Sequence, residues 1–330
     1  MKRRKFLTAT LKSTALISIS AQHLFACNDD EAGPSSSLPA PRNLHAATFN
    51  TSNNELLIFG GSTASGEDNL LWSFRNNTWT QLSSAGPDKR EDSLLIYHKQ
   101  NNRSYLIGGR SFSSNQNYAD FWEWNGSTWN QLSDSNPFGY LAHTCAAYDE
   151  KNNRIVLFGG LKQGAPSNEL WMWSDNEWKQ IPVEGEWPSA RLAASLVYSS
   201  AHKKIFLFGG SQTNGTIITD VWQLDGGTWS KKNEAFPRIG NGAYHVAAME
   251  DQFVMFGGFT ESRQRSSKQF VYDVELNEWS DVSITEPTAR ALHSLVNDPT
   301  NNRLLMFGGG SAESLLNELW AYKNNTWTQL

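Results

Sequence analysis

One short pattern recurs six times along this chain: an apolar run that closes on two consecutive glycines. The six pairs are Gly60-Gly61, Gly108-Gly109, Gly159-Gly160, Gly209-Gly210, Gly257-Gly258 and Gly308-Gly309. Their first glycines follow one another at steps of 48, 51, 50, 48 and 51 residues. A period near 50 is typical of propellers and other repeat arrays, in which each repeat buries its apolar face only against its neighbours.

Each repeat is predicted to fold as four short antiparallel strands. In residues 138–181 the expected strands are 142–148, 154–158, 169–173 and 177–181. Asn152 and Asn153 suit the first tight turn, because Asn tolerates positive φ. Short strands joined by turns at this regular spacing favour an antiparallel meander. Six such units predict an all-β fold, a six-bladed β-propeller over residues 41–330 with four antiparallel strands per blade.

Tryptophan follows the same period. Eleven of the 14 tryptophans fall at two repeat positions, one on the third predicted strand and one on the fourth, and Tyr272 replaces the third-strand Trp of the fifth unit. Residues that recur in this way are expected to pack between adjacent sheets. Ring closure is expected to rest on the packing of the first and last blades, without a strand exchanged between the chain ends. An extra strand from residues 38–44 that clasps the last blade is the alternative. Four tryptophans are predicted to make that contact: Trp72, Trp79, Trp320 and Trp327.

The segment before the first strand of each repeat carries a sequence pattern that resembles that of a known family. An Arg-x-x-His sequence is complete at Arg42–His45 and Arg290–His293 and partial in the other units. Together with the double glycine and the Trp that follows 18–21 residues later, it resembles the kelch repeat, and the resemblance covers residues 41–330. Four histidines are interpreted as equivalent scaffold residues of this repeat: His45, His143, His245 and His293. The resemblance implies that the first strand of each blade is innermost.

Strand parity predicts a binding face. Alternating strand directions place the tight turns on one face and the longer second-to-third and fourth-to-first connections on the other, and function usually lies on such loops. By the resemblance, five residues would surround the channel mouth on this side: Arg42, Arg90, Tyr140, Arg191 and Arg290. Guanidinium groups there would suit a carboxylate or another anion. Trp187 is a further ligand-binding candidate on the same loops, and together with Phe112, Tyr118 and Phe236 it could supply an apolar or sugar-stacking surface.

The alternative interpretation of the arginines is structural. Because they recur at a repeat position, each could instead bridge neighbouring blades by pairing with a carboxylate. Five acidic residues are candidates for that role: Glu67, Asp120, Glu169, Asp220 and Glu318.

Residues 1–26 are interpreted as a lipoprotein signal peptide. Lys2 to Lys5 are all basic and precede a modestly apolar segment that ends in Leu24-Phe25-Ala26-Cys27. A basic start before a short apolar run is typical of secretory signals. The last four residues resemble a bacterial lipobox, which implies cleavage before Cys27 and lipid attachment at its thiol. An ordinary signal with an incidental Cys is the alternative, and Arg3-Arg4 also resembles the twin-arginine export motif.

Residues 27–40 are interpreted as a disordered tether, because an acidic, Ser- and Pro-rich segment cannot bury a core. The protein is therefore expected in the bacterial cell envelope, anchored to a membrane and facing the periplasm or the cell surface. Loss of residues 1–26 would remove five positive charges and no negative ones, and would move the net charge from −5 to −10. Such an acidic chain is a poor partner for nucleic acid. A monomer is expected, and Cys145 is the sole thiol after Cys27.

The search for catalytic motifs favours a binding module. The sequence has no zinc-type Cys/His spacing, calcium loop, nucleophile elbow or P-loop, so neither a metal nor another cofactor is predicted. The predicted function is non-catalytic binding of a glycan or a cell-surface protein through the long-loop face.

Two enzyme families share the kelch architecture. Galactose oxidase needs a Tyr–Cys crosslink at copper and is disfavoured, because Cys145 lies in the middle of a predicted strand. N-acetylneuraminate epimerase is the alternative to a binding module, with mutarotation of an acidic sugar as its reaction. That reaction would need a carboxylate beside Arg191 or Arg290. The candidates are Glu67, Glu184, Glu186 and Glu261.

Overall fold

The computed structural model describes residues 38–83, 85–140, 142–233, 237 and 240–330. All the secondary-structure elements assigned within these residues are β-strands. The same residues contain no helix that could cross a membrane. The predicted signal peptide, Cys27, most of the predicted tether and the loop residue Phe236 lie outside the described residues.

Six four-stranded antiparallel sheets make up most of the described chain. The innermost strands are β2 (Ala46–Asn50), β8 (Leu94–His98), β14 (Cys145–Asp149), β20 (Ser195–Ser199), β24 (Gly240–Met249) and β28 (Ser294–Asp298). The second strands are β3 (Glu55–Phe59), β9 (Arg103–Ile107), β15 (Arg154–Phe158), β21 (Lys204–Phe208), β25 (Gln252–Phe259) and β29 (Arg303–Phe307). The third strands are β6 (Leu71–Arg75), β12 (Phe121–Trp124), β18 (Leu170–Ser174), β22 (Val221–Asp225), β26 (Gln269–Asp273) and β30 (Leu319–Lys323). The outermost strands are β7 (Thr78–Ser83), β13 (Trp129–Ser133), β19 (Glu177–Ile181), β23 (Thr228–Asn233), β27 (Glu278–Val282) and β31 (Thr326–Gln329).

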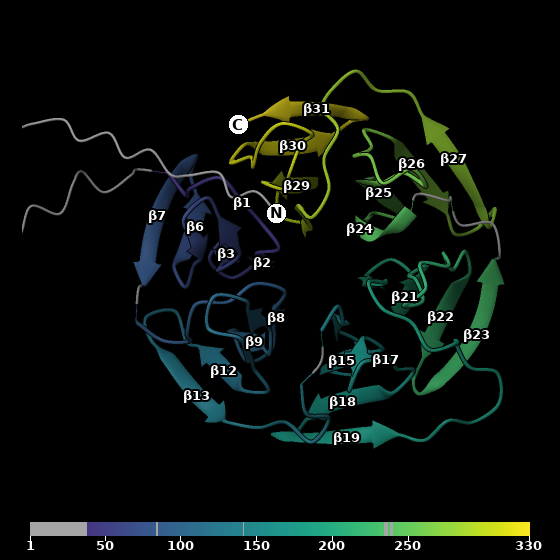
Figure 1. The fold of residues 1–330 in the computed structure, drawn as a ribbon. Coiled ribbons are helices and arrows are strands. Elements are labelled where there is room, and N and C mark those ends of the chain that lie inside the picture. Colours follow the sequence, from purple (N-terminus) through teal and green to yellow (C-terminus); the bar gives the residue numbers. More distant parts are fainter. Residues whose placement is uncertain (1–37, 84, 141, 234–236, 238–239) are drawn as a thin grey trace, which may run out of the picture. The chain divides into compact units, whose positions relative to one another are not determined.

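These sheets close into a ring through their innermost strands (Figure 1). Each innermost strand contacts the next one around the ring: β2 contacts β8, β8 contacts β14, β14 contacts β20, β20 contacts β24, β24 contacts β28, and β28 contacts β2. The predicted six-bladed β-propeller with four antiparallel strands per blade is therefore confirmed. Within the described residues, the four strands of each blade come from one continuous stretch of the chain. Blade six consists of β28 to β31 and contains no strand from the other end of the chain.

One hydrophobic cluster fills each of the six seams between neighbouring blades. In five seams, a Trp of the outermost strand meets the second-strand Phe that directly precedes the glycine pair of the preceding blade, with ring centroids 4.9–5.7 Å apart. The pairs are Trp129–Phe59, Trp229–Phe158, Trp279–Phe208, Trp327–Phe256 and, across the ring closure, Trp79–Phe307. In the seam between blades two and three, Trp178 contacts Phe121 and Phe138 instead. The repeated tryptophans thus pack between sheets, as predicted.

The strand register corrects two details of the tryptophan prediction. In blade five the residue equivalent to the third-strand Trp is Phe270, which pairs with Met255, and Tyr272 lies two residues further along the strand. At the ring closure, Trp72 and Trp79 pack against blade six, whereas Trp320 and Trp327 pack against blade five. The tryptophans of each blade face the preceding blade, so those of blades one and six lie in different seams.

The glycine pairs have a steric explanation. All twelve glycines have positive φ, where a side chain is strained. A Cβ on Gly60 would lie 2.5 Å from the carbonyl oxygen of Arg90 in the next blade, and one on Gly61 would lie 2.8 Å from the Cβ of His45 in its own blade. The first glycine therefore makes room for the neighbouring blade, and the second makes room for the innermost strand.

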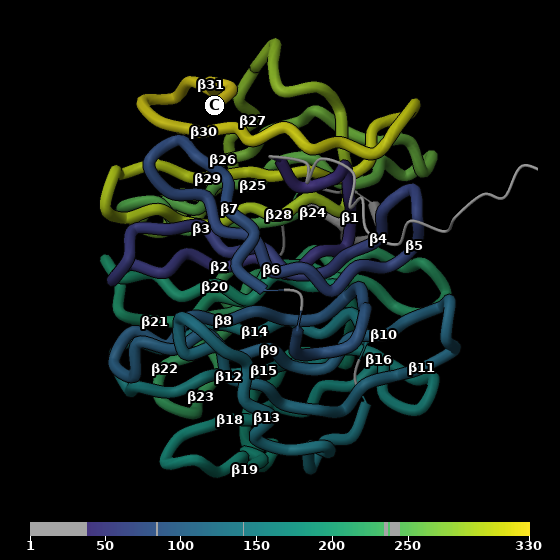
Figure 2. The backbone as a smooth tube through the Cα atoms, turned by 90° about the vertical axis from the view of Figure 1, so that its left-hand side faces the viewer, coloured from purple at the N-terminus to yellow at the C-terminus, as the bar shows by residue number. Residues whose placement is uncertain are grey.

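The two faces of the ring carry different connections. On one face, tight turns join the first and second strands, and Asn54, Asn102, Asn153 and Asn302 adopt the expected positive φ there. On the other, the second-to-third connections of the first three blades fold as the hairpins β4–β5 (Ser62–Thr63, Gly66–Glu67), β10–β11 (Arg110–Ser111, Gln116–Asn117) and β16–β17 (Leu161–Lys162, Ala165–Pro166). These hairpins gather on one side of the ring with β1 (Arg42–Asn43), as Figure 2 shows. We name this side the long-loop face and the opposite side the short-turn face.

Candidate functional site

Four of the segments that lead into the innermost strands are fastened to the preceding blade by the same pair of backbone bonds. In blade two, the amide of Arg90 donates to the carbonyl of Asp68 at 3.0 Å, and Gly61 donates to the carbonyl of Arg90 at 2.9 Å. The same pair of bonds closes the ring, where Arg42 donates to Leu316 at 3.0 Å and Gly309 donates to Arg42 at 2.9 Å. The N-terminal lead-in segment therefore docks on blade six as the segments at Arg90, Arg191 and Arg290 dock on their neighbours.

The four candidate arginines lie inside this connection. Their side chains are at most 1% exposed. Each guanidinium forms an ion pair of 2.5–2.9 Å within its own blade: Arg42–Asp68, Arg90–Asp120, Arg191–Asp220 and Arg290–Glu318. Each also donates to the carbonyl of the first glycine of its blade. The arrangement joins the lead-in segment to the second and third strands.

These contacts agree with a structural role for the arginines, but the predicted bridges between neighbouring blades are wrong, because each ion pair lies within one blade. Asp120, Asp220 and Glu318 are the partners that the sequence suggested. Arg42 takes Asp68 in place of Glu67, and Glu169 pairs with Lys162 at 2.7 Å. Ligand binding by the arginines stays a prediction, and it would have to proceed through groups that are already buried and paired.

The other two candidates lie nearer the surface. Tyr140 is half-buried, and burial raises the pKa of its phenol, which lies beside Arg110. Trp187 donates its indole N–H to the carbonyl of Asn168 at 2.9 Å and packs against Trp229 with ring centroids 6.4 Å apart. Trp187 thus extends a blade seam, whereas Tyr140 remains at the mouth of the channel.

Left-handed residues form a collar at the channel mouth. Five non-glycine residues just before the innermost strands have φ of 51–61°: Leu44, Asp92, His143, Ala193 and Leu292. Backbone bonds link neighbours in this collar, from Leu44 to Leu292 at 3.1 Å, from Asp92 to Leu44 at 2.9 Å and from Ala193 to His143 at 2.8 Å. Between Asp92 and His143 the link is made by a side chain, because the amide of His143 donates to Asp92 Oδ2 at 3.2 Å. Non-glycine residues in this conformation are strained and cluster at functional sites.

The collar corrects the predicted alignment of the blades at two repeat positions, that of the arginines and that of the histidines. The arginines lie two residues before the collar, so the equivalent position in blade three is 141, and Tyr140 precedes it. The histidines are not equivalent either. His45 and His293 directly follow the collar, His143 is part of it, and His245 lies one residue further into its strand, paired with Phe256.

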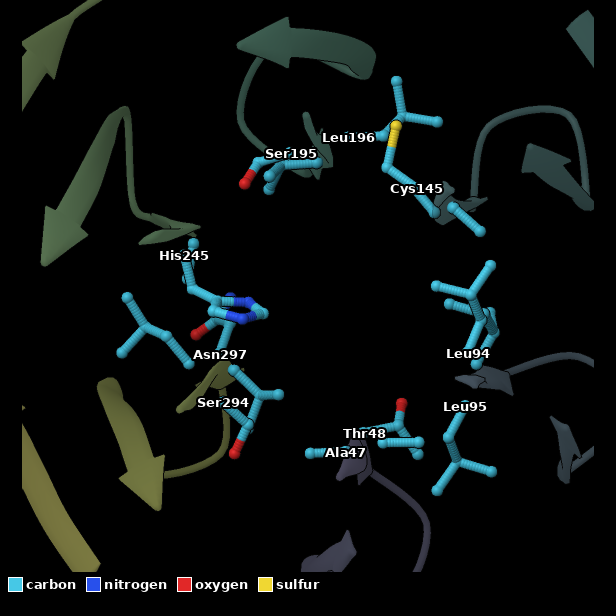
Figure 3. A pocket seen from close by; sticks show the side chains of 18 of the residues that line it. Ala47, Thr48, Leu94, Leu95, Cys145, Ser195, Leu196, His245, Ser294 and Asn297 are labelled. Carbon is cyan, nitrogen blue, oxygen red and sulfur yellow. The ribbon is translucent and has the colours of Figure 1, made fainter. Parts of the chain in front are cut away.

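The innermost strands surround a central cavity of about 650 Å³ (Figure 3). Its lining includes the apolar side chains of Leu94, Ile96, Val197 and Val296. The His245 side chain points into the cavity, and burial lowers its pKa from 6.5 to about 4. A cavity of this volume is within the range of small-molecule pockets. Burial also raises the pKa of the Cys145 thiol to about 12, consistent with a core residue.

Titratable side chains from blades two and three gather beside the collar. We name Glu91, Asp92, Arg110, Tyr140 and His143 the mouth cluster. Arg110 Nε lies 3.3 Å from Glu91 Oε1 and 3.8 Å from Asp92 Oδ2, while His143 Nδ1 lies 3.2 Å from the same Asp92 oxygen. Burial raises the pKa of Glu91, with the neighbouring Asp92 adding to the effect and Arg110 opposing it. The cluster therefore places hydrogen-bond acceptors and hydrogen-bond donors side by side at the channel mouth.

Phe112 extends the mouth cluster onto the surface. Its side chain is 67% exposed at the tip of the β10–β11 hairpin, and the Arg110 guanidinium lies 4.4 Å from the centre of its ring. The Glu67 carboxylate of blade one accepts hydrogen bonds from the amides of Phe112 at 2.8 Å and Ser113 at 3.2 Å. A hydrogen bond from the Ser113 hydroxyl, helped by these two amide bonds, lowers the pKa of Glu67. An exposed aromatic ring is thus presented on a backbone that a neighbouring blade holds in place.

Sequence reasoning did not identify Asp92 or Arg110 and treated His143 as scaffold. The available signals were weak: an acidic pair directly after Arg90, and an arginine directly after Gly109. Metal binding finds no support in the described part of the chain, where no group of three or more His, Cys, Asp or Glu side chains could hold an ion.

Comparison with known proteins identifies the repeat. Residues 142–330, more than half of the chain, match the KLHDC2/KLHL20/DRC7 Kelch-repeats domain. The F-box/kelch-repeat protein At1g51550 of Arabidopsis thaliana is 26% identical over 252 residues, which cover 72% of this chain and 43% of that protein. Kelch domain-containing protein 2 of Bos taurus is 26% identical, with coverage of 62% and 58%. The chain thus spans about half the length of these two relatives.

A solved structure supports the same fold. YjhT superposes with a TM-score of 0.70 over 89% of this chain and 99% of that chain, at 18% sequence identity. Likeness at this identity concerns the fold. The repeated glycine pairs, the ring of six sheets and the family match over more than half of the chain agree, and the chain belongs to the KLHDC2/KLHL20/DRC7 kelch-repeat family.

Proposed function

We propose that this chain is a non-catalytic binding module that receives a glycan or a cell-surface protein on its long-loop face. The kelch propeller supports interaction modules in general, because variable loops are held on a rigid scaffold. The observation that carries the proposal is Phe112, an exposed ring stacked by Arg110 on a hairpin that Glu67 fixes. Aromatic and arginine side chains in such settings dominate binding energies, and a fixed backbone reduces the entropy lost on binding.

Binding of the full-length protein to neutral, sialylated and uronic-acid glycans on an array, and to intact cells, tests this proposal. Phe112→Ala should weaken the interaction about tenfold or more. Leu276→Ala is the control, because Leu276 is 69% exposed between β26 and β27 on the short-turn face. Equal binding by the two variants, or chemical turnover of a bound sugar, would contradict the proposal.

The proposal includes export and attachment to a membrane of the bacterial cell envelope through Cys27. Its support is the basic, apolar and lipobox-like order of residues 2–27. Full-length protein with Cys27→Ser should move from the membrane fraction to the soluble fraction on cell fractionation. If that variant stays with the membrane, the lipid anchor at Cys27 is wrong.

An isomerase that acts on an acidic sugar is the second candidate. The observation in its favour is Glu91, a carboxyl group at the channel mouth whose pKa is raised by burial, as acid–base catalysis requires. Of the residues that the sequence suggested, Arg191 and Arg290 are paired within their own blades, Glu67 is bound to the β10–β11 hairpin, and Glu184, Glu186 and Glu261 are exposed. An NMR measurement of the rate at which sialic acid anomers equilibrate decides between the candidates. Acceleration by the protein would favour the isomerase, and an unchanged rate would remove it.

A further inference from the structure

The charge of the mouth cluster bears on which ligand it can accept. The four lead-in arginines are neutralised by carboxylates of their own blades. Arg110 is left at the mouth with two acidic neighbours, Glu91 and Asp92, at 3.3 and 3.8 Å. A carboxylate or sulfate that approached this point would meet two acidic groups and a single guanidinium. Because juxtaposed like charges are costly, the cluster disfavours an anionic ligand.

The accessible groups of the cluster suit hydroxyl groups. The side chains of Asp92, Arg110 and His143 are 13%, 19% and 30% exposed, and Tyr140 is half-buried. A carboxylate accepts hydrogen bonds, a guanidinium donates them, and a phenol or a neutral imidazole can do both. Asp92 binds the Nδ1 side of the His143 ring, which orients the imidazole and leaves Nε2 for a ligand. Such a mixed set can satisfy several neighbouring hydroxyl groups at once.

Phe112 supplies the apolar half of the same surface. One face of its ring is covered by the Arg110 guanidinium, and 67% of the side chain is still exposed. A pyranose ring carries C–H groups on its faces and hydroxyl groups at its edge. An aromatic ring beside planar polar side chains therefore matches both parts of a sugar.

We propose that Phe112 and the mouth cluster form a binding subsite for a neutral saccharide. Asp92, Arg110, His143 and Tyr140 hydrogen-bond the hydroxyl groups, Phe112 stacks against the sugar ring, and Glu91 orients Arg110 from behind. This inference rests on the proposed function, because it names the class of partner that the long-loop face receives.

Calorimetric titration of the full-length protein tests the subsite. The probes are neutral disaccharides of glucose, galactose, mannose and N-acetylglucosamine, each compared with a uronic-acid disaccharide. We expect a neutral sugar to bind more tightly than its acidic counterpart. Asp92→Asn and Phe112→Ala should each weaken that binding about tenfold or more. Asn is chosen at position 92 because it tolerates the left-handed φ of 58°, so the collar should keep its form.

Asp175→Asn is the matched control, since Asp175 is an exposed aspartate with φ of 52° on the turn between β18 and β19, on the short-turn face. Thermal unfolding of each variant verifies that it is folded. Preference for the acidic sugar, unchanged binding by Asp92→Asn and Phe112→Ala, or an equal loss in Asp175→Asn would overturn the inference. If no sugar binds but Phe112→Ala abolishes binding to a cell-surface protein, the saccharide inference falls and the proposed function stands.

Discussion

At four lead-in segments, a buried arginine holds together the strands of its own blade. Arg90, for example, forms two hydrogen bonds with the Asp120 carboxylate, at 2.6 and 2.9 Å, and a third with the carbonyl of Gly108. Removing one partner of a buried ion pair is far more costly than the pair itself is favourable, because the remaining charge loses its compensation. These arginines are therefore expected to affect stability before they affect binding.

Asp120→Ala tests this expectation. The variant leaves the Arg90 guanidinium without its carboxylate and should lower the free energy of unfolding by about 3–5 kcal/mol. Asp134→Ala, at an exposed loop position, should change it by no more than about 0.5 kcal/mol. Urea denaturation measures both, and similar small losses in the two variants would refute the structural role.

Stability should also fall in mild acid because of the histidines that line the cavity. Burial is the main cause of a lowered pKa at His45, His245 and His293, and Arg42 and Arg290 lower it further at His45 and His293, respectively. For His245 the pKa falls from 6.5 to about 4, so between these values the unfolded chain binds a proton that the folded protein does not. The contribution is complete above pH 6.5 and is lost as the pH falls toward 4, by on the order of 1.4 kcal/mol per pH unit.

Urea denaturation at several pH values across this window measures the effect. His245→Asn should flatten the slope relative to the parent protein, because one of the groups that titrate only in the unfolded chain is removed. A free energy of unfolding that is constant across the window would contradict the assignment.

Among the structural elements, the glycine pair that ends each second strand is the most demanding sterically. A Cβ at Gly160 would lie 2.0 Å from Thr144 Oγ1 and 2.9 Å from the carbonyl of Ala142, at φ of 93°. At Gly126, φ is 101° and a Cβ would meet nothing within 4 Å. Gly126→Ala should therefore cost about 1–2 kcal/mol from backbone strain alone. Gly160→Ala should cost clearly more in the same denaturation experiment, and equal costs would show that the close approach does not matter.

The ring-closing seam should be as strong as an internal one. Phe307 with Trp79 at the closure repeats the geometry of Phe158 with Trp229 between blades three and four, and both phenylalanines are fully buried. Phe307→Ala and Phe158→Ala should each lower the free energy of unfolding by about 3–5 kcal/mol. A much smaller loss for Phe307→Ala would indicate that the ring is weakly closed.

The repeat made the fold predictable, because six in-phase copies carry the same strand and turn signals. Single positions were less predictable. The residues before each innermost strand cannot be aligned by spacing alone, so Tyr140, His143 and His245 were placed one residue out of phase. Hydrogen-bond register and φ resolve that ambiguity.

The candidate site was less predictable still, because its contacts are remote in sequence. Arginine and carboxylate partners are 28–30 residues apart at Arg90, Arg191 and Arg290. Glu67 reaches Phe112 across 45 residues and a blade boundary. The repeat suggested Asp120, Asp220 and Glu318 as possible partners, but a buried paired arginine has the same sequence signature as one that faces a ligand, so the two interpretations stayed open.

At the scale of the whole propeller, the two faces are built differently. The short-turn face is built from tight turns closed by side chains such as Asn50 and Asp149, which accept amide hydrogen bonds of their own turns. The long-loop face carries the hairpins, the strained collar and the mouth cluster. The proposed function therefore lies on the long-loop face, and the short-turn face is expected to serve as scaffold.

Hydrogen–deuterium exchange of the full-length protein tests that division most directly. Exchange would be compared with and without a saturating neutral disaccharide that binds in the titration. The account predicts slower exchange in the β10–β11 hairpin and in residues 91–93, with no change in the turns between β18 and β19 and between β26 and β27. Protection confined to those turns, or spread evenly over both faces, would contradict it.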